Sequence, residues 1–333
     1  MKEFSHGGDV KSFAKKYGLK KVIDLSSNIN FLKPKIDLDF NKLDISSYPN
    51  YDDFYKQVAK HFSVKKTQLE LYNGGSSAIF TLFKELDVKH CTIYSPAYLE
   101  YKRVAKLLHV KTELINRFDD IYKKPEKNSL VIFVNPSTPD GKLYDLKKLF
   151  KIWEKAEATV LIDESFLEFC EAKSSVGMLK KYKKLYILKS MTKFYASAGV
   201  RVGVIISKKK NIKKLKQNEP LWKLSQFDVA YLSEALKDKK FAKKTLKVTK
   251  ENREFLVNLL EKTDKFEKIY KSDANFVLAK LKNQTAKEFQ EKLVEKSVMV
   301  RDCSNFDFLD ESFVRIAVKS KKDINTLLNK KVL

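Results

Sequence analysis

The chain has 333 residues, and 67 Lys and Arg stand against 42 Asp and Glu, so its formal net charge is +25. Hydrophobic residues make up 43% of it, which is typical of a folded protein and excludes a largely disordered one. No run of about 18 apolar residues occurs, so we expect no membrane span. The first ten residues lack the apolar stretch of a secretory signal, and we therefore expect a cytoplasmic protein.

The cysteines, the histidines and the distribution of charge argue against a metal site and a nucleic-acid-binding surface. The three cysteines and four histidines show no spacing typical of metal ligands, so the sequence predicts no metal site. Lysines are spread along the whole chain, many on the polar face of amphipathic stretches such as 146–153. This distribution favours a solvated surface over a nucleic-acid footprint. The positive charge is still expected to attract small anionic substrates.

The pattern of apolar segments predicts an α/β fold. Apolar residues recur with helical spacing over 99–108 and 146–155, which predicts a helix in each range. Strands are predicted from apolar runs at 91–94, 111–115, 130–134, 159–162, 185–188 and 202–206. Strands that are apolar throughout and separated by helices indicate a mostly parallel sheet with helices on both faces.

The last third of the chain changes character and predicts a smaller α+β domain. It begins with a long lysine-rich helix over 241–260 and ends in a short helix. Between them we expect a strand at 275–281, a helix at 286–296, and strands at 298–302 and 313–319. We therefore divide the chain into an N-terminal arm (1–35), a large domain (36–235) and a small C-terminal domain (236–333).

Two glycine-bearing strings are candidates for ligand loops. Gly74-Gly75-Ser76-Ser77 opens an apolar helix, where free N–H groups and hydroxyls form a phosphate cradle or a simple serine cap. The string 135–141, Asn-Pro-Ser-Thr-Pro-Asp-Gly, follows an apolar strand. It is either a ligand loop at the carboxyl end of a parallel strand or a structural turn.

Two further strings carry reactive side chains. Asp163 and Glu164 end an apolar strand, where a carboxylate can pair with a cationic ring nitrogen or with Mg²⁺. The chain has no GxxxxGK[ST] loop, which counts against a nucleotide and Mg²⁺. Lys193 directly follows a strand and lies among small hydroxyl residues, unlike the lysines of solvated helix faces. Burial near other cations lowers the pKa of such an amine, which can then form a Schiff base.

Over nearly its whole length the chain resembles the fold-type I enzymes that use pyridoxal 5′-phosphate (PLP). The most specific string is Ser190-x-Thr192-Lys193-x5-Gly199-x-Arg201-x-Gly203. Within this group the chain is similar to the histidinol-phosphate aminotransferase branch, and most of all to threonine-phosphate decarboxylases. That similarity is carried by four strings: His6-Gly7-Gly8-Asp9, 25–30, 192–196, and 301–306 followed by 314–317.

The resemblance implies a role for each site residue. Lys193 would hold PLP and move protons, and Asp163 would pair with the ring nitrogen. The cofactor phosphate would be bound by Gly75, Ser76, Ser190 and Arg201, with Tyr48 reaching it from the other subunit of a homodimer. Tyr98 would stack on the ring. For the substrate, Arg315 would bind the carboxylate, and Arg301, His6 with the adjoining Gly7, and Asn30 would bind a phosphate.

Two positions depart from the aminotransferase pattern. Thr138 stands where the family has an asparagine that bonds the PLP 3′-oxygen. Phe166 stands where many aminotransferases have a tyrosine, and the decarboxylases share this phenylalanine.

The function implied is decarboxylation of O-phospho-L-serine or O-phospho-L-threonine, with the departures at Thr138 and Asp9 tilting the choice toward phosphoserine. An aminotransferase acting on a small phosphorylated amine or amino acid is the alternative, since the same side chains serve both reactions. A non-catalytic binding protein on this fold is disfavoured, because it would have no reason to keep Lys193, Asp163 and the phosphate groups together.

Overall fold

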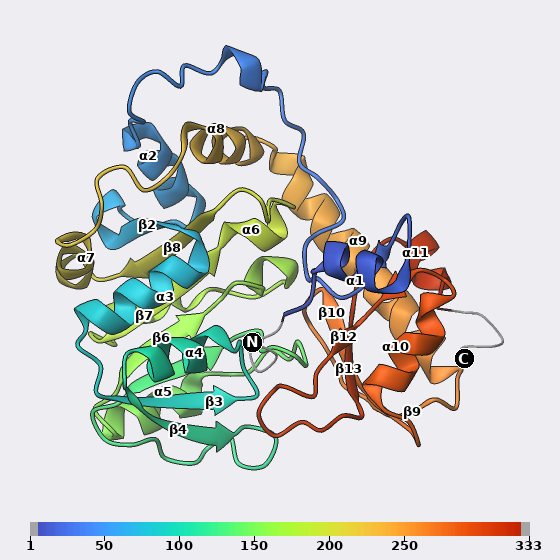
Figure 1. Cartoon of the computed structure of the whole chain (residues 1–333). Helices are drawn as coiled ribbons and strands as arrows, with labels where there is room; N and C mark the ends of the chain where they lie inside the picture. The colour runs from blue at the N-terminus through green and yellow to red at the C-terminus, as the bar shows by residue number, and fades with distance from the viewer. Residues whose placement is uncertain (1–5, 328–333) are drawn as a thin grey trace.

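The computed structural model describes residues 6–327, and its larger part is built around a seven-stranded sheet (Figure 1). The strand order is β2-β8-β7-β6-β5-β3-β4. The strands are β2 (Leu69–Asn73), β3 (His90–Ser95), β4 (Lys111–Asn116), β5 (Leu130–Val134), β6 (Thr159–Asp163), β7 (Leu185–Ser190) and β8 (Val202–Ser207). Strand β8 runs opposite to the other strands of this sheet, because it is antiparallel to both of its neighbours, β2 and β7. The expected α/β fold with a mostly parallel sheet is therefore confirmed, although β2 was not predicted.

Helices cover both faces of this sheet, which explains why its strands are apolar throughout. One face packs against α3 (Gly74–Glu85), α4 (Glu100–Leu107) and α7 (Lys209–Lys216). The other packs against α2 (Asp52–His61), α5 (Lys147–Lys155) and α8 (Gln226–Ala235). A single turn, α6 (Met191–Phe194), directly follows β7.

The smaller part contains a four-stranded antiparallel sheet in the order β12-β13-β10-β9. Its strands are β9 (Phe266–Ile269), β10 (Phe276–Leu281), β12 (Arg301–Asp302) and β13 (Phe313–Ala317). Helices α9 (Lys239–Glu261), α10 (Ala286–Val294) and α11 (Lys321–Asn325) accompany it, and α1 (Val10–Tyr17) lies beside it in Figure 1. From the N-terminal arm, β1 (Ile23–Asp24) pairs with β11 (Val298–Met299), and Leu25 is fully buried in this core.

The predicted strand over 298–302 is wrong in one respect, because it is divided at Val300 into β11 and β12, which join different sheets. The Gln290 side chain takes the backbone bonds at this point. It donates to the Val298 carbonyl at 2.8 Å and accepts from the Val300 N–H at 2.8 Å. The chain can therefore change partners without leaving these groups unsatisfied.

Helix α9 connects the two parts. Its Phe241 packs in the core of the large sheet, and its Leu256, Leu259 and Leu260 pack in the core of the small one. The predicted limit at residues 235 and 236 lies between α8 and α9, and the division into three regions stays a prediction. No helix within residues 6–327 has the length and apolar character needed to span a membrane.

Candidate active site

A cavity of about 430 Å³ lies where the carboxyl ends of the large sheet face the small sheet. The ends of β5, β6 and β7 and the start of α3 all meet here, as expected for a ligand site in an α/β sheet. All the predicted site residues line it except Tyr48 and Asn30. We call the part formed by Asp163, Ser190, Lys193 and Arg201 the sheet end, and the part around Arg301 and Arg315 the arginine end.

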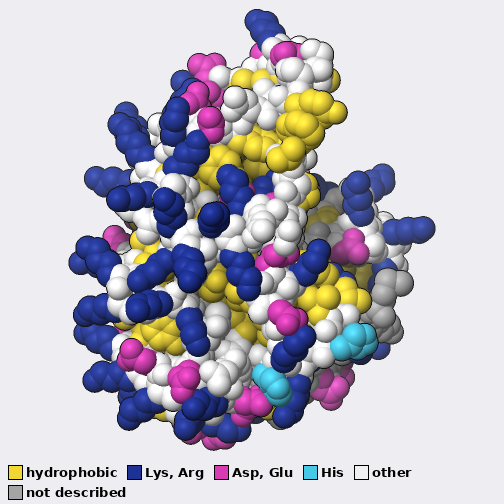
Figure 2. Space-filling view, turned by 90° about the vertical axis from the view of Figure 1, so that its left-hand side faces the viewer, with side chains coloured by type: hydrophobic (Ala, Val, Ile, Leu, Met, Phe, Trp, Pro, Cys, Tyr) yellow, Lys and Arg dark blue, Asp and Glu magenta, His cyan; other side chains and the backbone are white. Residues whose placement is uncertain are grey.

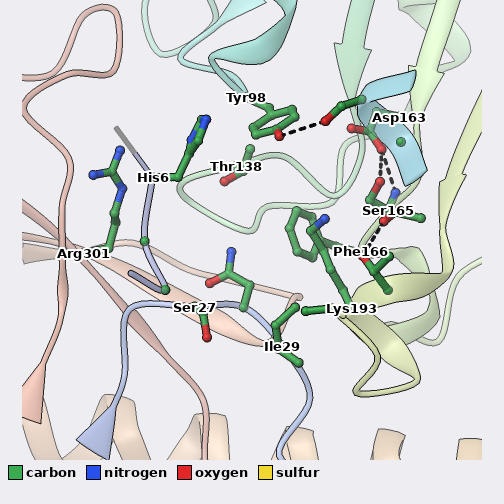
Figure 3. A pocket seen from close by; sticks show the side chains of 18 of the residues that line it. His6, Ser27, Ile29, Tyr98, Thr138, Asp163, Ser165, Phe166, Lys193 and Arg301 are labelled. Carbon is green, nitrogen blue, oxygen red and sulfur yellow. Dashed lines mark hydrogen bonds between the residues drawn. The ribbon is translucent and has the colours of Figure 1, made fainter. Parts of the chain in front are cut away.

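Lys193 lies at the sheet end on the turn that follows β7. Its amine points into the cavity beside the Phe166 ring, with Nζ 5.5 Å from the ring centroid (Figure 3). No side chain within residues 6–327 forms a hydrogen bond or ion pair with it. Burial, assisted by the charges of Arg201 and Arg315, lowers the pKa of this amine below its usual value. A lysine of this kind is a better nucleophile and base at neutral pH than a surface lysine.

Asp163 ends β6 and is held in one orientation by neighbouring groups. Its Oδ1 accepts from the Ser165 N–H at 2.8 Å and the Ser165 hydroxyl at 2.5 Å (Figure 3). Its Oδ2 accepts from the Tyr101 hydroxyl at 2.7 Å. Asp163 is only 4% exposed, and among the described residues no lysine or arginine lies within salt-bridge distance of its carboxylate. It is a buried anion that a cationic ring nitrogen would complement.

The start of α3 forms an anion cradle through close backbone packing. Gly203 lies so near that a Cβ there would be 2.6 Å from the Gly74 carbonyl carbon and 2.8 Å from the Gly75 nitrogen. A Cβ on Gly74, whose φ is +79°, would lie 2.5 Å from Nη2 of Arg201. Glycine at both positions therefore lets Arg201 lie against the helix N-terminus, where N–H groups are free.

Hydroxyl groups complete this cradle. Ser190 and Thr192 share a hydrogen bond of 2.9 Å, and the Ser76 hydroxyl lies 3.5 Å from the Tyr98 hydroxyl. Free N–H groups, hydroxyls and a guanidinium form the donor set that a phosphate requires. These residues fit the phosphate of PLP, and Lys193 and Asp163 fit its aldehyde and ring nitrogen.

The arginine end holds two buried arginines on adjacent strands. Arg301 on β12 and Arg315 on β13 are directly opposite each other in the antiparallel pair and are 7% and 8% exposed. Like charges in this arrangement repel, so an anion between them would stabilise the pair.

The contacts of Arg315 are incomplete without such an anion. Its Nη1 donates to the Thr138 hydroxyl at 3.1 Å and its Nη2 to the Ser26 carbonyl at 3.1 Å, whereas its buried Nε has no partner. No carboxylate within residues 6–327 pairs with it. Burial, together with the charge of Arg301, lowers the pKa of Arg315 to about 10, so it still carries its charge at neutral pH.

The N-terminal segment covers this end. His6 lies between Arg301 and Tyr98 (Figure 3), with its ring 5.3 Å from that of Tyr98. Partial burial and the positive charge of Arg301 lower the pKa of His6. A Cβ on Gly7 would lie 2.5 Å from the Ser26 carbonyl oxygen, so only glycine brings the segment this close. The neighbouring Asp9 caps α1 by accepting from the Ser12 N–H.

Two predicted site residues lie elsewhere. Asn30 does not line the cavity, because its amide is already used within the protein, so its contact with a substrate phosphate stays a prediction. It donates to the Phe194 carbonyl and the Thr245 hydroxyl and accepts from the Leu32 N–H. Tyr48 is 74% exposed and stacks on Trp222, with ring centroids 4.1 Å apart. A role for Tyr48 in a second subunit's site stays a prediction.

Sequence reasoning missed residues adjacent to those it found. Asn28 lines the cavity in place of Asn30, and its buried Oδ1 has no partner. Gly74, rather than Gly75, is the position where a side chain would collide with Arg201. Tyr101, which holds Asp163, carried no signal except its place three residues after Tyr98. In residues 6–327 no three of the His, Cys, Asp and Glu side chains are arranged to hold a metal ion.

Comparison with known sequences places these features in a family. A profile described as aminotransferase class I and II matches residues 20–330. A protein of Caldanaerobacter subterraneus, named provisionally as a threonine-phosphate decarboxylase, is 31% identical over 97% of this chain and 92% of its own length. The histidinol-phosphate aminotransferase of Methanosphaera stadtmanae is 27% identical over 96% of this chain and 92% of its own length.

Solved structures agree on the architecture. The crystal structure of the histidinol-phosphate aminotransferase from Clostridium acetobutylicum superposes with a TM-score of 0.80 at 29% identity. The match covers 91% of this chain and 96% of that one. Relatives named for a decarboxylase and for an aminotransferase are therefore similar to this chain to nearly the same degree.

Proposed function

Because the chain belongs to the aminotransferase class I and II family, whose members use PLP, we propose that it is a PLP-dependent decarboxylase of a small O-phospho-L-amino acid. The substrate would be O-phospho-L-serine or O-phospho-L-threonine, and the products CO2 and the phosphorylated amine. The threonine-phosphate decarboxylase name of the relative from Caldanaerobacter subterraneus supports this proposal.

The observation that carries the substrate proposal is the pair Arg301 and Arg315. Their side chains start from opposite positions of β12 and β13, both are buried, and both line the cavity. Each guanidinium can bind one oxyanion through two parallel hydrogen bonds. A phosphorylated amino acid carries a phosphate at one end and a carboxylate at the other, and it would therefore offer one oxyanion to each arginine.

The proposed roles of the side chains follow from their positions. Bound PLP supplies a ring that accepts the electron pair left at the substrate Cα. Asp163 would anchor the ring nitrogen, and the cradle of Gly75, Ser76, Ser190 and Arg201 would hold the phosphate. Lys193, with its lowered pKa, would bind the cofactor and then deliver a proton to Cα after CO2 has left.

At the arginine end, Arg315 would bind the substrate carboxylate, and Arg301, His6 and Asn28 would bind the phosphate. Asn28 enters this proposal because it lines the cavity, where its amide NH2 can donate to a phosphate oxygen. The pocket must place the bond from Cα to the carboxylate perpendicular to the ring, since only that bond is then cleaved. Thr138, which accepts from Arg315, and Phe166, beside Lys193, restrict the space in which the substrate can lie.

The test is to incubate the holoenzyme with each phosphorylated amino acid in the absence of any keto acid. We expect CO2 and phosphoethanolamine or 1-amino-2-propanol phosphate. If CO2 does not form, and amino transfer occurs only after a keto acid is added, the decarboxylase proposal is wrong. The aminotransferase alternative would then stand first, as the similarity to histidinol-phosphate aminotransferases allows.

We also propose a homodimer in which Tyr48 completes the partner's site. Tyr48 is one of several exposed apolar side chains on residues 40–48 and 221–227, where Phe40 contacts Phe227 and Tyr48 stacks on Trp222. Hydrophobic side chains also gather toward the top of Figure 2, at the height of α8 and residues 36–51 in Figure 1. An apolar surface of this kind is typical of a protein interface.

Mixing two inactive variants tests the dimer. Tyr48→Ala and Lys193→Ala should partly restore activity together, because one of the mixed sites contains both native residues. A strictly monomeric active enzyme would rule out the shared site. Lys and Arg side chains cover much of the face shown in Figure 2, and the expectation of no nucleic-acid partner stays a prediction. Cytoplasmic localisation stays a prediction.

A further inference from the structure

A tyrosine behind the cavity wall, Tyr101, contacts the carboxylate at the sheet end. It lies on α4, three residues after Tyr98, and its side chain is fully buried. The two rings meet edge to face with centroids 6.0 Å apart. Tyr98 lines the cavity, whereas Tyr101 does not. The Tyr101 hydroxyl donates to Oδ2 of Asp163 at 2.7 Å, so its effect on the cavity passes through Asp163.

The hydrogen bonds of Asp163 leave one acceptor position open. A carboxylate oxygen accepts two hydrogen bonds through its lone pairs. Oδ1 already accepts two, from the N–H and the hydroxyl of Ser165. Oδ2 accepts one, from Tyr101, among the described residues. The remaining lone pair on Oδ2 is thus the one available to a group bound in the cavity that Asp163 lines.

We propose that Tyr101 is a positioning residue that fixes Oδ2 of Asp163 for the ring nitrogen of the cofactor. The inference rests on the pairing of Asp163 with that nitrogen, as proposed above. A hydrogen bond to the charged form of a carboxylate stabilises that form. The hydrogen bond from Tyr101 therefore fixes the direction of the remaining lone pair on Oδ2, so that this oxygen can pair with a protonated ring nitrogen, the state in which the ring accepts electrons.

The surroundings of Tyr101 keep its hydroxyl in the donor state. Burial, and then the charge of Asp163, raise the pKa of Tyr101 well above its usual value. The phenol therefore stays protonated at neutral pH. Its ring also packs in the core with Val104 and Ala105, so a variant that tests the hydroxyl must keep the ring. Tyr101→Phe does this.

The experiment compares two ligands of the apoenzyme: PLP and its analogue with carbon in place of the ring nitrogen. Tyr101→Phe should bind PLP about tenfold more weakly, the effect of losing one hydrogen bond to a charged group. It should bind the nitrogen-free analogue as tightly as the parent protein does. Equal weakening for both ligands, or no weakening for PLP, would overturn the proposal, because a purely structural tyrosine cannot sense the nitrogen.

Two controls separate this proposal from its premise. Tyr94→Phe removes a buried hydroxyl that contacts Trp153 and the Lys123 carbonyl, and it should leave the ratio of the two affinities unchanged. Asp163→Asn should weaken PLP binding more than analogue binding. If Asp163→Asn discriminates the ligands and Tyr101→Phe does not, only the role of Tyr101 is wrong. If neither does, the pairing of Asp163 with the nitrogen is wrong.

A second variant guards against a folding defect. Tyr101→Leu also removes the hydroxyl but fills the core differently. Both variants should show the same loss of preference for PLP over the analogue, whatever their melting temperatures. A loss confined to the less stable variant would count against the proposal.

Discussion

The two ends of the cavity are built in different ways. At the sheet end, the reactive groups are fixed by short contacts between the strands and the helices that cover them, such as Gly203 against Gly74 and Tyr101 against Asp163. At the arginine end, the groups come from β12, β13 and the N-terminal segment, and Arg315 retains an unpartnered Nε. The sheet end is thus prepared for one ligand in one pose. At the arginine end no carboxylate within residues 6–327 pairs with Arg315, so the final arrangement there depends on the substrate.

The largest effect should come from breaking the sheet end at Lys193. Lys193→Ala removes the amine that would bind the cofactor and move protons, so we expect activity to fall by about 10³-fold or more. Borohydride reduction of the holoenzyme and peptide mapping should label Lys193 in the parent protein, and the variant should carry no label there. Surface Lys208→Ala should keep full activity as the control. Labelling at another lysine would remove the basis for the whole cofactor assignment.

A different outcome is expected at the arginine end. Arg315→Met should lower kcat/KM by roughly 10² to 10³-fold, because a buried ionic contact with the substrate is lost. The absorbance spectrum of bound PLP should remain, since the cradle and Lys193 are intact. Arg301→Ala should behave in the same way. If either variant loses the cofactor spectrum, that arginine binds the cofactor, and the two ends are not separate.

A smaller effect should follow from filling the cradle. Gly203→Ala places a methyl group against the backbone of Gly74 and Gly75, so the start of α3 must move. We expect PLP binding about tenfold weaker and unfolding easier by about 1–3 kcal/mol, as for overpacked sites. Gly199→Ala is the matched control, because nothing lies within 4 Å of its added carbon. PLP affinity in Gly203→Ala equal to that of Gly199→Ala would show that the cradle tolerates the shift.

The same contrast explains which parts of the site could be predicted from the sequence. Lys193 and Arg201 belong to one continuous string, and Asp163 ends an apolar strand, so their chemistry is visible in the residue order. The direction of a side chain in an irregular segment is not visible. Asn28 and Asn30 are two residues apart, but Asn30 turns inward because Thr245, far away in the sequence, offers a hydrogen bond. Contacts of this range also explain why the role of Tyr101 was missed.

For the fold, strands buried on both faces were the easiest elements to predict. The run 130–134 is a strand over the same residues as predicted, because an apolar segment of that length is typical of a strand buried on both faces of a sheet. The strand β2 was missed because its Glu70 and Tyr72 look exposed in the sequence. In the structure Lys223 pairs with Glu70 at 2.6 Å, and both β2 side chains are buried. Because Lys223 lies 153 positions away in the chain, the sequence around β2 gives no sign that Glu70 is buried.

The smallest effect should come from Asp9, where the chain departs from the asparagine of the decarboxylases it resembles. The structure uses this side chain to cap α1, and asparagine and aspartate cap helices about equally well. Asp9→Asn should therefore change kcat/KM less than about twofold. Asp9→Ala should cost roughly 1 kcal/mol of local helix stability and loosen the segment that carries His6 and Gly7. Hydrogen exchange of α1 together with steady-state kinetics measures both. If Asp9→Asn alters the preference between phosphoserine and phosphothreonine, Asp9 contributes to the arginine end directly, and that end extends further along the arm than the contacts of the free protein indicate.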